Sequence, residues 1–301
     1  LRNIGPLRYG ENPHQQAAVY VEDGARPWWV EATQHQGKEM SFNNYADTEA
    51  AWRLAAELGD GAVVVVKHTN AAGAARGASV AGAFEAAWEG DPLAAFGGVI
   101  AVNGELDGPT ASALAERFVE VLIARSTTSE ALEALAEKKN LRVLTAPLPG
   151  ADDTDFRRVE GGFLTQERDR VDLEGWETVS EREPTDDELT SLRFAWIVAA
   201  HTKSNAIVIA HGERAVGVGA GDQSRVGAAE RAVAKAGERS RGGVAASDAF
   251  FPFRDGLDTL ADAGVAAIVE PGGSLNDQEV IDAANERGLA LVFTNRRHFR
   301  H

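Results

Sequence analysis

The chain has 301 residues, of which 44% are hydrophobic and 25% charged, a balance typical of a soluble globular protein. It contains no cysteine, which excludes disulfides, thiolate nucleophiles and cysteine-ligated zinc, although a zinc site built from scattered His and Asp stays open. The net charge of −16 argues against nucleic-acid binding, because an acidic surface repels phosphates. The sequence has no apolar run of membrane-spanning length and no apolar signal segment, so we expect a cytosolic protein that does not bind membranes.

The basic residues are 24 Arg and only 6 Lys. An acidic excess with little lysine is typical of a high-salt cytoplasm, where dense carboxylates keep a protein hydrated, so we expect a halophilic protein. A GC-rich genome that favours Arg codons would produce the same bias. In both cases an anionic substrate needs local Arg and Lys side chains to overcome the overall charge.

Short apolar runs alternate with helix-like stretches along the chain. The runs are rich in Val and Ile, are bounded by Gly and lack polar alternation, as in strands that are buried on both faces of an α/β sheet. In chain order, the pattern predicts a helix over 47–58 capped by Asp47, strands over 61–66 and 98–102, a helix from Pro109 through Leu122, a helix over 184–200, strands over 206–210, 215–218 and 264–269, a helix over 274–288 with Ser274 and Asp277 as a capping pair, and a strand over 289–293.

The segment between the two groups of elements has a different composition. It begins with Pro147-Leu148-Pro149-Gly150 and continues with a dense run of charges. We interpret it as a surface connection between two α/β units. The predicted division is a first unit at 1–150, a connection at 151–183 and a second unit at 184–301, with no internal sequence repeat.

The pair Lys67-His68 is the sharpest candidate for chemistry. It directly follows the apolar run 61–66, and ligands of open α/β sheets bind beyond the carboxyl ends of strands. The lysine charge favours the neutral imidazole, which can accept a proton. A solvated strand end is the alternative interpretation.

Four further segments could bind a ligand, each with an ordinary structural alternative. Glycines at 217–221 could contact an anion or form a tight turn, and the aromatic run 247–253 could cover a flat ligand or fill a core corner. The segment 270–274 could bind an anion or simply begin a helix. The C-terminal residues 294–301 carry five basic or titratable side chains, which form either a local positive patch or a solvated tail.

Nine short segments follow one another along the chain in an order that is informative as a set. They are R-Y-G-E-N-P-H-Q from Arg8, G-K-E-M-S-F-N-N from Gly37, K-H from Lys67, A-F-G-G from Ala95, K-S-N-A-I-V from Lys203, S-R-V from Ser224, S-D-A-F-F-P-F from Ser247, P-G-G-S from Pro271, and the ending Arg297 to His301. In this order they resemble one family, the aminoimidazole carboxamide ribonucleotide (AICAR) transformylases. The resemblance covers essentially the whole chain.

The resemblance implies two tandem cytidine-deaminase-like α/β/α subdomains without zinc, in a homodimer whose active sites are built from both chains. A cyclohydrolase domain precedes this region in the bifunctional proteins of the family. Because Arg8 lies almost at the start of the chain, we expect that domain and its activity to be missing, either because the gene encodes only the transformylase or because the chain is a fragment of a longer protein.

The implied reaction transfers a formyl group from 10-formyltetrahydrofolate, a co-substrate, to the 5-amino group of AICAR, with no tightly bound cofactor. A structural monovalent cation, which some relatives carry, stays open. By resemblance, His68 accepts the amine proton, Lys67 tunes it and stabilises negative charge, and Asn205 orients the carboxamide or formyl group. The matching substrate-binding positions, with phosphate contact implied for Arg8 and Arg297, are Arg8, Tyr9, Lys38, Arg225, Phe250, Asp255, Arg297 and His301.

Three positions depart from the family pattern. Ala71 and Ala72 replace a usual proline and cysteine, which leaves the loop of His68 less fixed, and Asp222 adds a carboxylate beside Gln223-Ser224-Arg225.

Three other functions stay open. First, formate with ATP could supply the formyl group, although the chain has no P-loop. Second, the protein could bind nucleotide without catalysis. Third, it could be a deaminase-like hydrolase, which the missing metal ligands disfavour.

Overall fold

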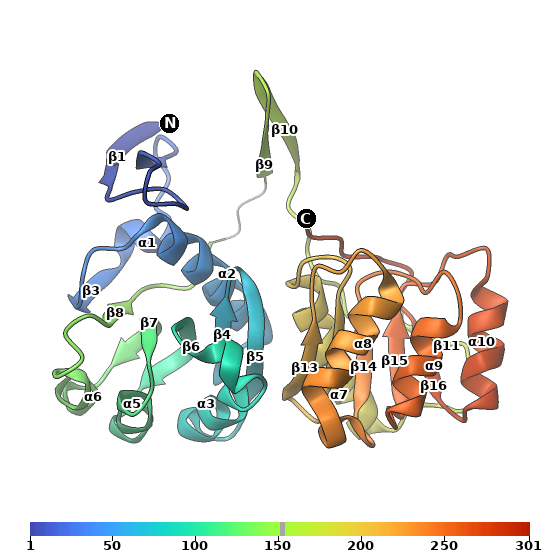
Figure 1. The fold of residues 1–301 in the computed structure, drawn as a ribbon. Helices are drawn as coiled ribbons and strands as arrows, with labels where there is room; N and C mark the ends of the chain where they lie inside the picture. Colours follow the sequence, from blue (N-terminus) through green and yellow to red (C-terminus); the bar gives the residue numbers. More distant parts are fainter. Residues whose placement is uncertain (151–153) are drawn as a thin grey trace.

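The computed structural model describes residues 1–150 and 154–301, which form two α/β units one after the other along the chain (Figure 1). Each unit contains a mixed six-stranded sheet with helices on both faces. None of the described helices has the length and apolar character needed to cross a membrane.

The first unit is built around a sheet whose three middle strands are parallel and whose other pairs are antiparallel. In spatial order the strands are β3 (Thr33–Gln36), β8 (Arg142–Thr145), β7 (Val119–Thr127), β6 (Gly98–Leu106), β4 (Ala62–Lys67) and β5 (Asn70–Arg76). The helices are α1 (Trp28–Glu31), α2 (Phe42–Leu58), α3 (Val80–Trp88), α4 (Pro92–Ala95), α5 (Gly108–Ala115) and α6 (Ser129–Leu135).

The second unit repeats this arrangement. In spatial order its strands are β11 (Glu177–Thr178), β16 (Ala290–Phe293), β15 (Ala267–Glu270), β14 (Val244–Ser247), β12 (Ile207–Ala210) and β13 (Ala215–Gly219). Its helices are α7 (Asp186–Ala200), α8 (Arg225–Ala236), the 3-10 turn η1 (Gly237–Ser240), α9 (Asp255–Asp262) and α10 (Asp277–Glu286). Both sheets have the same directions and the same order of connections, so the chain is a structural tandem without a visible sequence repeat.

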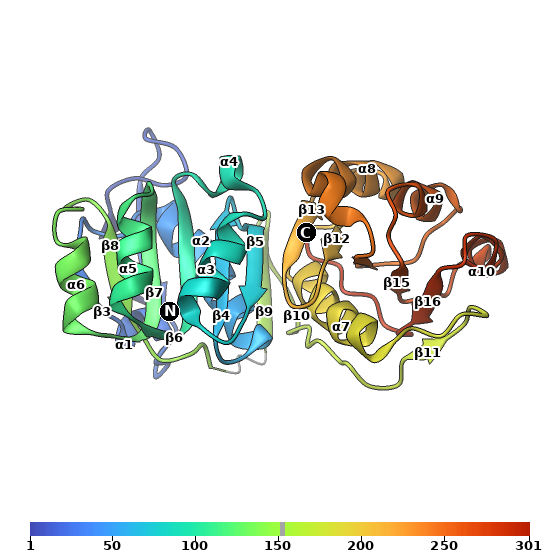
Figure 2. The same cartoon turned by 90° about the horizontal axis from the view of Figure 1, so that it is seen from below.

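The two units share one hydrophobic core. Helices α2 and α7 pack against each other and cover the same face of both sheets, with Trp52 and Trp196 fully buried. The opposite face of the first sheet is covered by α3, α5 and α6, and that of the second sheet by α8, α9 and α10. The edge strands β5 and β13 lie side by side, as both views show, so the sheets meet edge to edge (Figures 1 and 2).

Two hairpins stand outside these sheets. The first, β1 (Arg2–Leu7) with β2 (Ala17–Val21), lies above the first unit (Figure 1). The second, which we call the arm, consists of β9 (Thr154–Val159) and β10 (Gly162–Glu167) and projects away from both units.

The arm and β11 both fall within the segment 151–183 that we expected to be a surface connection. The first three residues of that segment lie outside the described residues. Because β11 pairs with β16, the end of the segment belongs to the second sheet.

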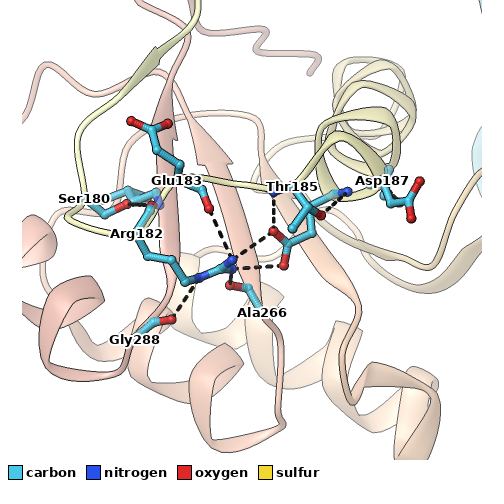
Figure 3. Close-up of polar contacts among 10 residues, drawn as sticks. Ser180, Arg182, Glu183, Thr185, Asp187, Ala266 and Gly288 are labelled. Atoms are coloured by element: carbon cyan, nitrogen blue, oxygen red, sulfur yellow. Dashed lines mark hydrogen bonds and ion pairs between the residues drawn. The ribbon is translucent and has the colours of Figure 1, made fainter.

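The end of this connection is bonded firmly to the second unit (Figure 3). Arg182 donates to the carbonyl oxygens of Gly288 and Ala266 at 3.0 and 2.5 Å, and to both carboxylate oxygens of Glu188 at 3.0 Å. Glu188 also accepts from the backbone of Thr185, and the Thr185 hydroxyl accepts from Glu188 N–H in return, which completes a capping box. Burial raises the pKa of the Glu188 carboxyl, but the bonds from Arg182 and Thr185 outweigh burial and hold it below its usual value.

The predicted strands are all present, but three predicted helix boundaries are wrong. Helix α2 begins after Ser41, whose side chain forms the capping box, so Asp47 lies inside the helix. Helix α5 ends at Ala115, because the following residues form β7. Helix α10 begins at Asp277 and not at Ser274, although the predicted pair is bonded: the Asp277 carboxylate accepts from Ser274 N–H at 2.8 Å and from Gly273 N–H at 2.7 Å.

Candidate active site

Strand β4 delivers Lys67 and His68 to the carboxyl edge of the first sheet. Lys67 is half-buried and its Nζ donates to the carbonyl oxygen of Gly97 at 2.6 Å, while the His68 side chain is exposed. His68 and Thr69 form the two-residue turn into β5, with φ values of 51° and 63°. The ammonium is therefore fixed against the sheet, and the imidazole faces solvent beside it.

Exposed apolar side chains surround the bonded Lys67–Gly97 pair. Phe96 and Phe118 are 61% and 51% exposed and their ring centroids lie 5.0 Å apart. Leu93, in the short helix α4, is 91% exposed. Such a patch beside polar groups is suited to a flat heteroaromatic ligand or to another protein surface.

Asp47 supports the turn from α2, a feature that the sequence analysis missed because it assigned this residue to a helix cap. Its Oδ1 accepts from the Thr69 N–H at 2.7 Å. Burial raises the pKa of the Asp47 carboxyl above its usual value, while the N–H groups of Thr69 and His68 and the charges of His68 and Lys67 act in the opposite direction.

Asn205 belongs to a buried polar network in the second unit. Its Nδ2 donates to Asp222 O at 2.9 Å, and its Oδ1 accepts from Arg225 Nη2 at 2.6 Å. Arg225 is only 7% exposed and forms an ion pair with the fully buried Asp248. Arg225 therefore acts on Asn205 from inside the protein in this structure, rather than presenting an open guanidinium to solvent.

The two units are joined close to these residues. The Asn70 side chain, which follows the His68–Thr69 turn, accepts from the Lys203 N–H at 2.9 Å. Lys203 lies two residues before Asn205, so the structure brings the turn of His68 and the segment of Asn205 together across the boundary between the units.

Arg297 and His301 are exposed in the C-terminal segment, as is Arg296, whereas His298 is buried. Arg297 stacks over Phe299 at 4.5 Å and lines a cavity of about 640 Å³. Most of the charged side chains around this cavity are arginines, and its lining comprises Gln166, Glu167, Arg168, Asp169, Arg170, Arg296, Arg297 and Phe299. The segment is held by His298, which is buried and bonds to Asp169 at 2.7 Å.

Three further predicted binding residues lie in the N-terminal part of the first unit. Arg8 and Tyr9 follow β1, with the guanidinium 5.6 Å from the Tyr9 ring centroid, and Lys38 is exposed after β3. Among the hydrogen bonds and ion pairs of the described residues, none connects these three side chains with the pair at the end of β4.

Phe250 and Asp255 flank the start of α9 in the second unit. Phe250 is half-buried and Asp255 is exposed, at the first position of the helix. Behind them, the buried Glu270 accepts from Phe251 N–H at 2.6 Å, and its other oxygen has no hydrogen-bond partner among the described residues. Burial, followed by the negative charge of Asp277, raises the pKa of the Glu270 carboxyl to about 8. The hydrogen bond from Phe251 N–H and the positive charge of Arg225 lower this pKa but do not outweigh burial. This carboxyl is another feature that the sequence analysis did not identify.

The glycines at 217–221 have a packing role. Gly217 and Gly219 lie within β13 and face α8, where an added Cβ would lie 2.2 and 2.0 Å from the carbonyl oxygens of Ala232 and Ala228. They allow the strand and helix to approach closely, which neither interpretation of the sequence anticipated. Gly221, with a φ of 67°, does occupy a turn.

No group of three or more His, Asp or Glu in the described part of the chain is arranged to hold a metal ion.

Comparison with known proteins places the sequence in a family. Residues 1–235 match the model of the AICARFT/IMPCHase bienzyme family. The bifunctional purine biosynthesis protein PurH of Jannaschia sp. is 49% identical over 313 residues, and that of Paracoccus denitrificans is 50% identical over 316. The alignments cover 98% of this chain but 59% of each relative, and PurH of Nostoc punctiforme, at 48% identity, gives nearly the same coverage. The chain therefore belongs to the AICARFT/IMPCHase bienzyme family.

Proposed function

We propose that this chain transfers a formyl group from 10-formyltetrahydrofolate to the 5-amino group of AICAR in purine biosynthesis. The observation that carries the proposal is the Lys67–His68 pair, placed at the carboxyl edge of the first sheet with the ammonium fixed on Gly97 and the imidazole free to meet a ligand. Membership of the AICARFT/IMPCHase bienzyme family, whose relatives are named as purine biosynthesis proteins, supports this substrate.

His68 serves as the general base. The amine of AICAR is conjugated with its imidazole ring and is a weak nucleophile, so its proton must leave as the amine attacks the formyl carbon. His68 accepts that proton, and the Lys67 ammonium stabilises the negative charge that develops on the formyl oxygen. The bond from the formyl carbon to the folate nitrogen then breaks, and that nitrogen takes up a proton as tetrahydrofolate leaves.

The ligands are held by groups that surround this pair. Asn205 orients the carboxamide or the formyl group, with Arg225 bonded to its amide oxygen. The arginine-rich cavity of the C-terminal segment suits a phosphate, because guanidinium groups bind phosphate bidentately and offset the acidic surface. The remaining proposed binding residues are Arg8, Tyr9, Lys38, Phe250, Asp255, Arg297 and His301.

A homodimer would bring these groups together. Within one chain, no hydrogen bond or ion pair of the described residues joins Arg8, Tyr9 or Lys38 to the pair at the end of β4, and a site built from residues of two chains would use all of them. The arm supports this arrangement: Phe156, Phe163 and Leu164 are exposed on an isolated two-stranded hairpin, which is marginally stable in water unless another surface covers it. We therefore propose that the arm packs on a second copy of the chain.

Removal of the arm tests the dimer. Light scattering should give twice the mass of one chain for the parent and the mass of one chain for a variant in which residues 154–167 are replaced by a short Gly/Ser linker. A parent that is monomeric at micromolar concentration would refute the dimer, and a dimeric variant would refute the role of the arm.

The fold of each unit is proposed to be cytidine-deaminase-like without zinc, which the repeated β-α-β-β-α-β order in both units supports. The structural monovalent cation and the halophilic adaptation remain predictions, and activity in a KCl series beside NaCl tests both.

The function is tested by formyl transfer from 10-formyltetrahydrofolate to AICAR, followed by the appearance of tetrahydrofolate. His68→Ala should lower kcat by about 10²–10⁴-fold. Turnover that requires formate and ATP would instead establish the other donor, and AICAR binding without turnover at any salt concentration would establish a binding role. Full activity in His68→Ala would keep the reaction and refute the base.

A further inference from the structure

The turn that carries His68 is held in a conformation that its own residues disfavour. Both turn residues have positive φ, as in the tightest hairpin turns, where Asn and Gly usually occupy these positions. A β-branched residue such as Thr69 is rarely found at positive φ, and this strained conformation persists only where the surrounding structure holds it. Something other than the turn sequence therefore fixes the position of His68.

Asp47 is the group best placed to do so. Its carboxylate lies on α2, directly beneath the turn, and accepts from Thr69 N–H at 2.7 Å. The carbonyl on the other side of the same peptide, that of His68, accepts from the Thr69 hydroxyl at 2.7 Å and from Asn70 Nδ2 at 3.2 Å. The peptide between His68 and Thr69 is thus bonded at both ends.

The surroundings make Asp47 more than a local support. The half-buried carboxylate interacts electrostatically with His68 and Lys67, and both charges lower its pKa. A negative charge here favours the protonated imidazole that forms when His68 takes up the amine proton. The Lys203 N–H holds Asn70 from the second unit at 2.9 Å, so the turn is also aligned with the segment of Asn205.

We infer that Asp47 is the positioning residue of the active site: its carboxylate holds the His68–Thr69 turn and so presents the imidazole beside the Lys67 ammonium. The hydrogen bond from Thr69 N–H to this carboxylate fastens the turn to a neighbouring helix. This inference rests on the proposed formyl transfer.

The test compares Asp47→Ala, Asp47→Asn and the double variant Asp47→Ala/Thr69→Gly with the parent chain. Asp47→Ala should lower kcat by about 10–100-fold, since small misplacements of a catalytic group have effects of this size, while the Kd for AICAR stays within about threefold. Asp47→Asn keeps an oxygen that can accept from Thr69 and should recover most of the rate. The acid limb of the pH–rate profile of Asp47→Asn should shift to lower pH than that of the parent, because the variant lacks the negative charge of the Asp47 carboxylate.

Thr69→Gly supplies the specific readout. Glycine adopts positive φ without strain, so the loss of Asp47 should cost at least fivefold less kcat in the Thr69→Gly background than in the parent. Glu49→Gln is the matched control, because Glu49 lies on the same helix but bonds Trp28 and Arg53, and its kcat should stay within about twofold of the parent.

The outcomes separate the two proposals. An inactive parent would remove the proposed function itself. The inference would be overturned, and the function kept, if the parent is active and His68→Ala is inactive while both single Asp47 variants keep the kcat and the pH profile of the parent. If Asp47→Ala does not fold, Asp47→Asn decides through its pH profile, and an unshifted profile would overturn the inference.

Discussion

Glu270 gives the chain a stability that should depend on pH in a defined way. In the folded chain burial raises its pKa to about 8, compared with 4.5 for an unperturbed side chain. The folded state therefore keeps a proton that the unfolded state releases once the pH exceeds about 4.5. By linkage, the contribution of this group to stability is fully present below pH 4.5 and is lost as the pH rises to about 8.

Glu270→Gln removes this dependence. A glutamine can accept from Phe251 N–H as the carboxyl does and carries no charge to bury. One pKa unit corresponds to about 1.4 kcal/mol, so the variant should be more stable than the parent by less than about 1 kcal/mol at pH 5, about 3 kcal/mol at pH 7 and about 5 kcal/mol at pH 9.

Urea unfolding followed by fluorescence of the six tryptophans measures the free energy of unfolding at each pH. Glu177→Gln is a suitable control, because it makes the same chemical change at an exposed position on the edge strand of the same sheet. If Glu270→Gln and the parent differ by the same amount at pH 5, 7 and 9, the carboxyl is not neutral in the folded chain and the reasoning is wrong.

Three further changes test the packing and polar contacts by the same unfolding assay. Gly219→Ala should destabilise by about 1–3 kcal/mol, because its Cβ would collide with Ala228 O and separate β13 from α8; unchanged stability would refute the packing role. Asp248→Ala should cost about 3–5 kcal/mol, because it leaves the buried Arg225 charge without its ion pair, and a loss below about 1 kcal/mol would contradict that pairing. Thr185→Ala should cost about 1 kcal/mol by removing the cap of α7, and no loss would mean that the Arg182–Glu188 contacts alone hold the helix start.

The sequence predicted the centre of each sheet better than its edges. The run 61–66 reads as a buried strand because burial on both faces leaves only apolar residues, and β4 lies there. Its neighbour β5, with the sequence N-A-A-G-A-A-R, carries alanines that favour helices, and only its pairing with β4 makes it a strand. The helix predicted through Leu122 failed for a related reason: the apolar spacing fitted a helix, but β7 is stabilised by its parallel neighbours.

The candidate site was predictable where its residues adjoin a recognisable strand end. The position of Lys67 and His68 follows from the apolar run before them. The role of Asp47 was not predictable, because a carboxylate that bonds the backbone 22 residues later in the chain leaves no local pattern. Glu270 was hidden for the same reason, since its burial depends on helices and turns that only the folded chain brings around it.

The repetition of one architecture in both units has a consequence for how the chain divides its work. The turn between β4 and β5 carries His68, and its counterpart between β12 and β13 carries Glu213. Glu213 accepts from the backbone of Arg76 at 2.9 Å and also forms an ion pair with its side chain. The same corner of the fold thus carries the proposed general base in one unit and fastens the two units together in the other.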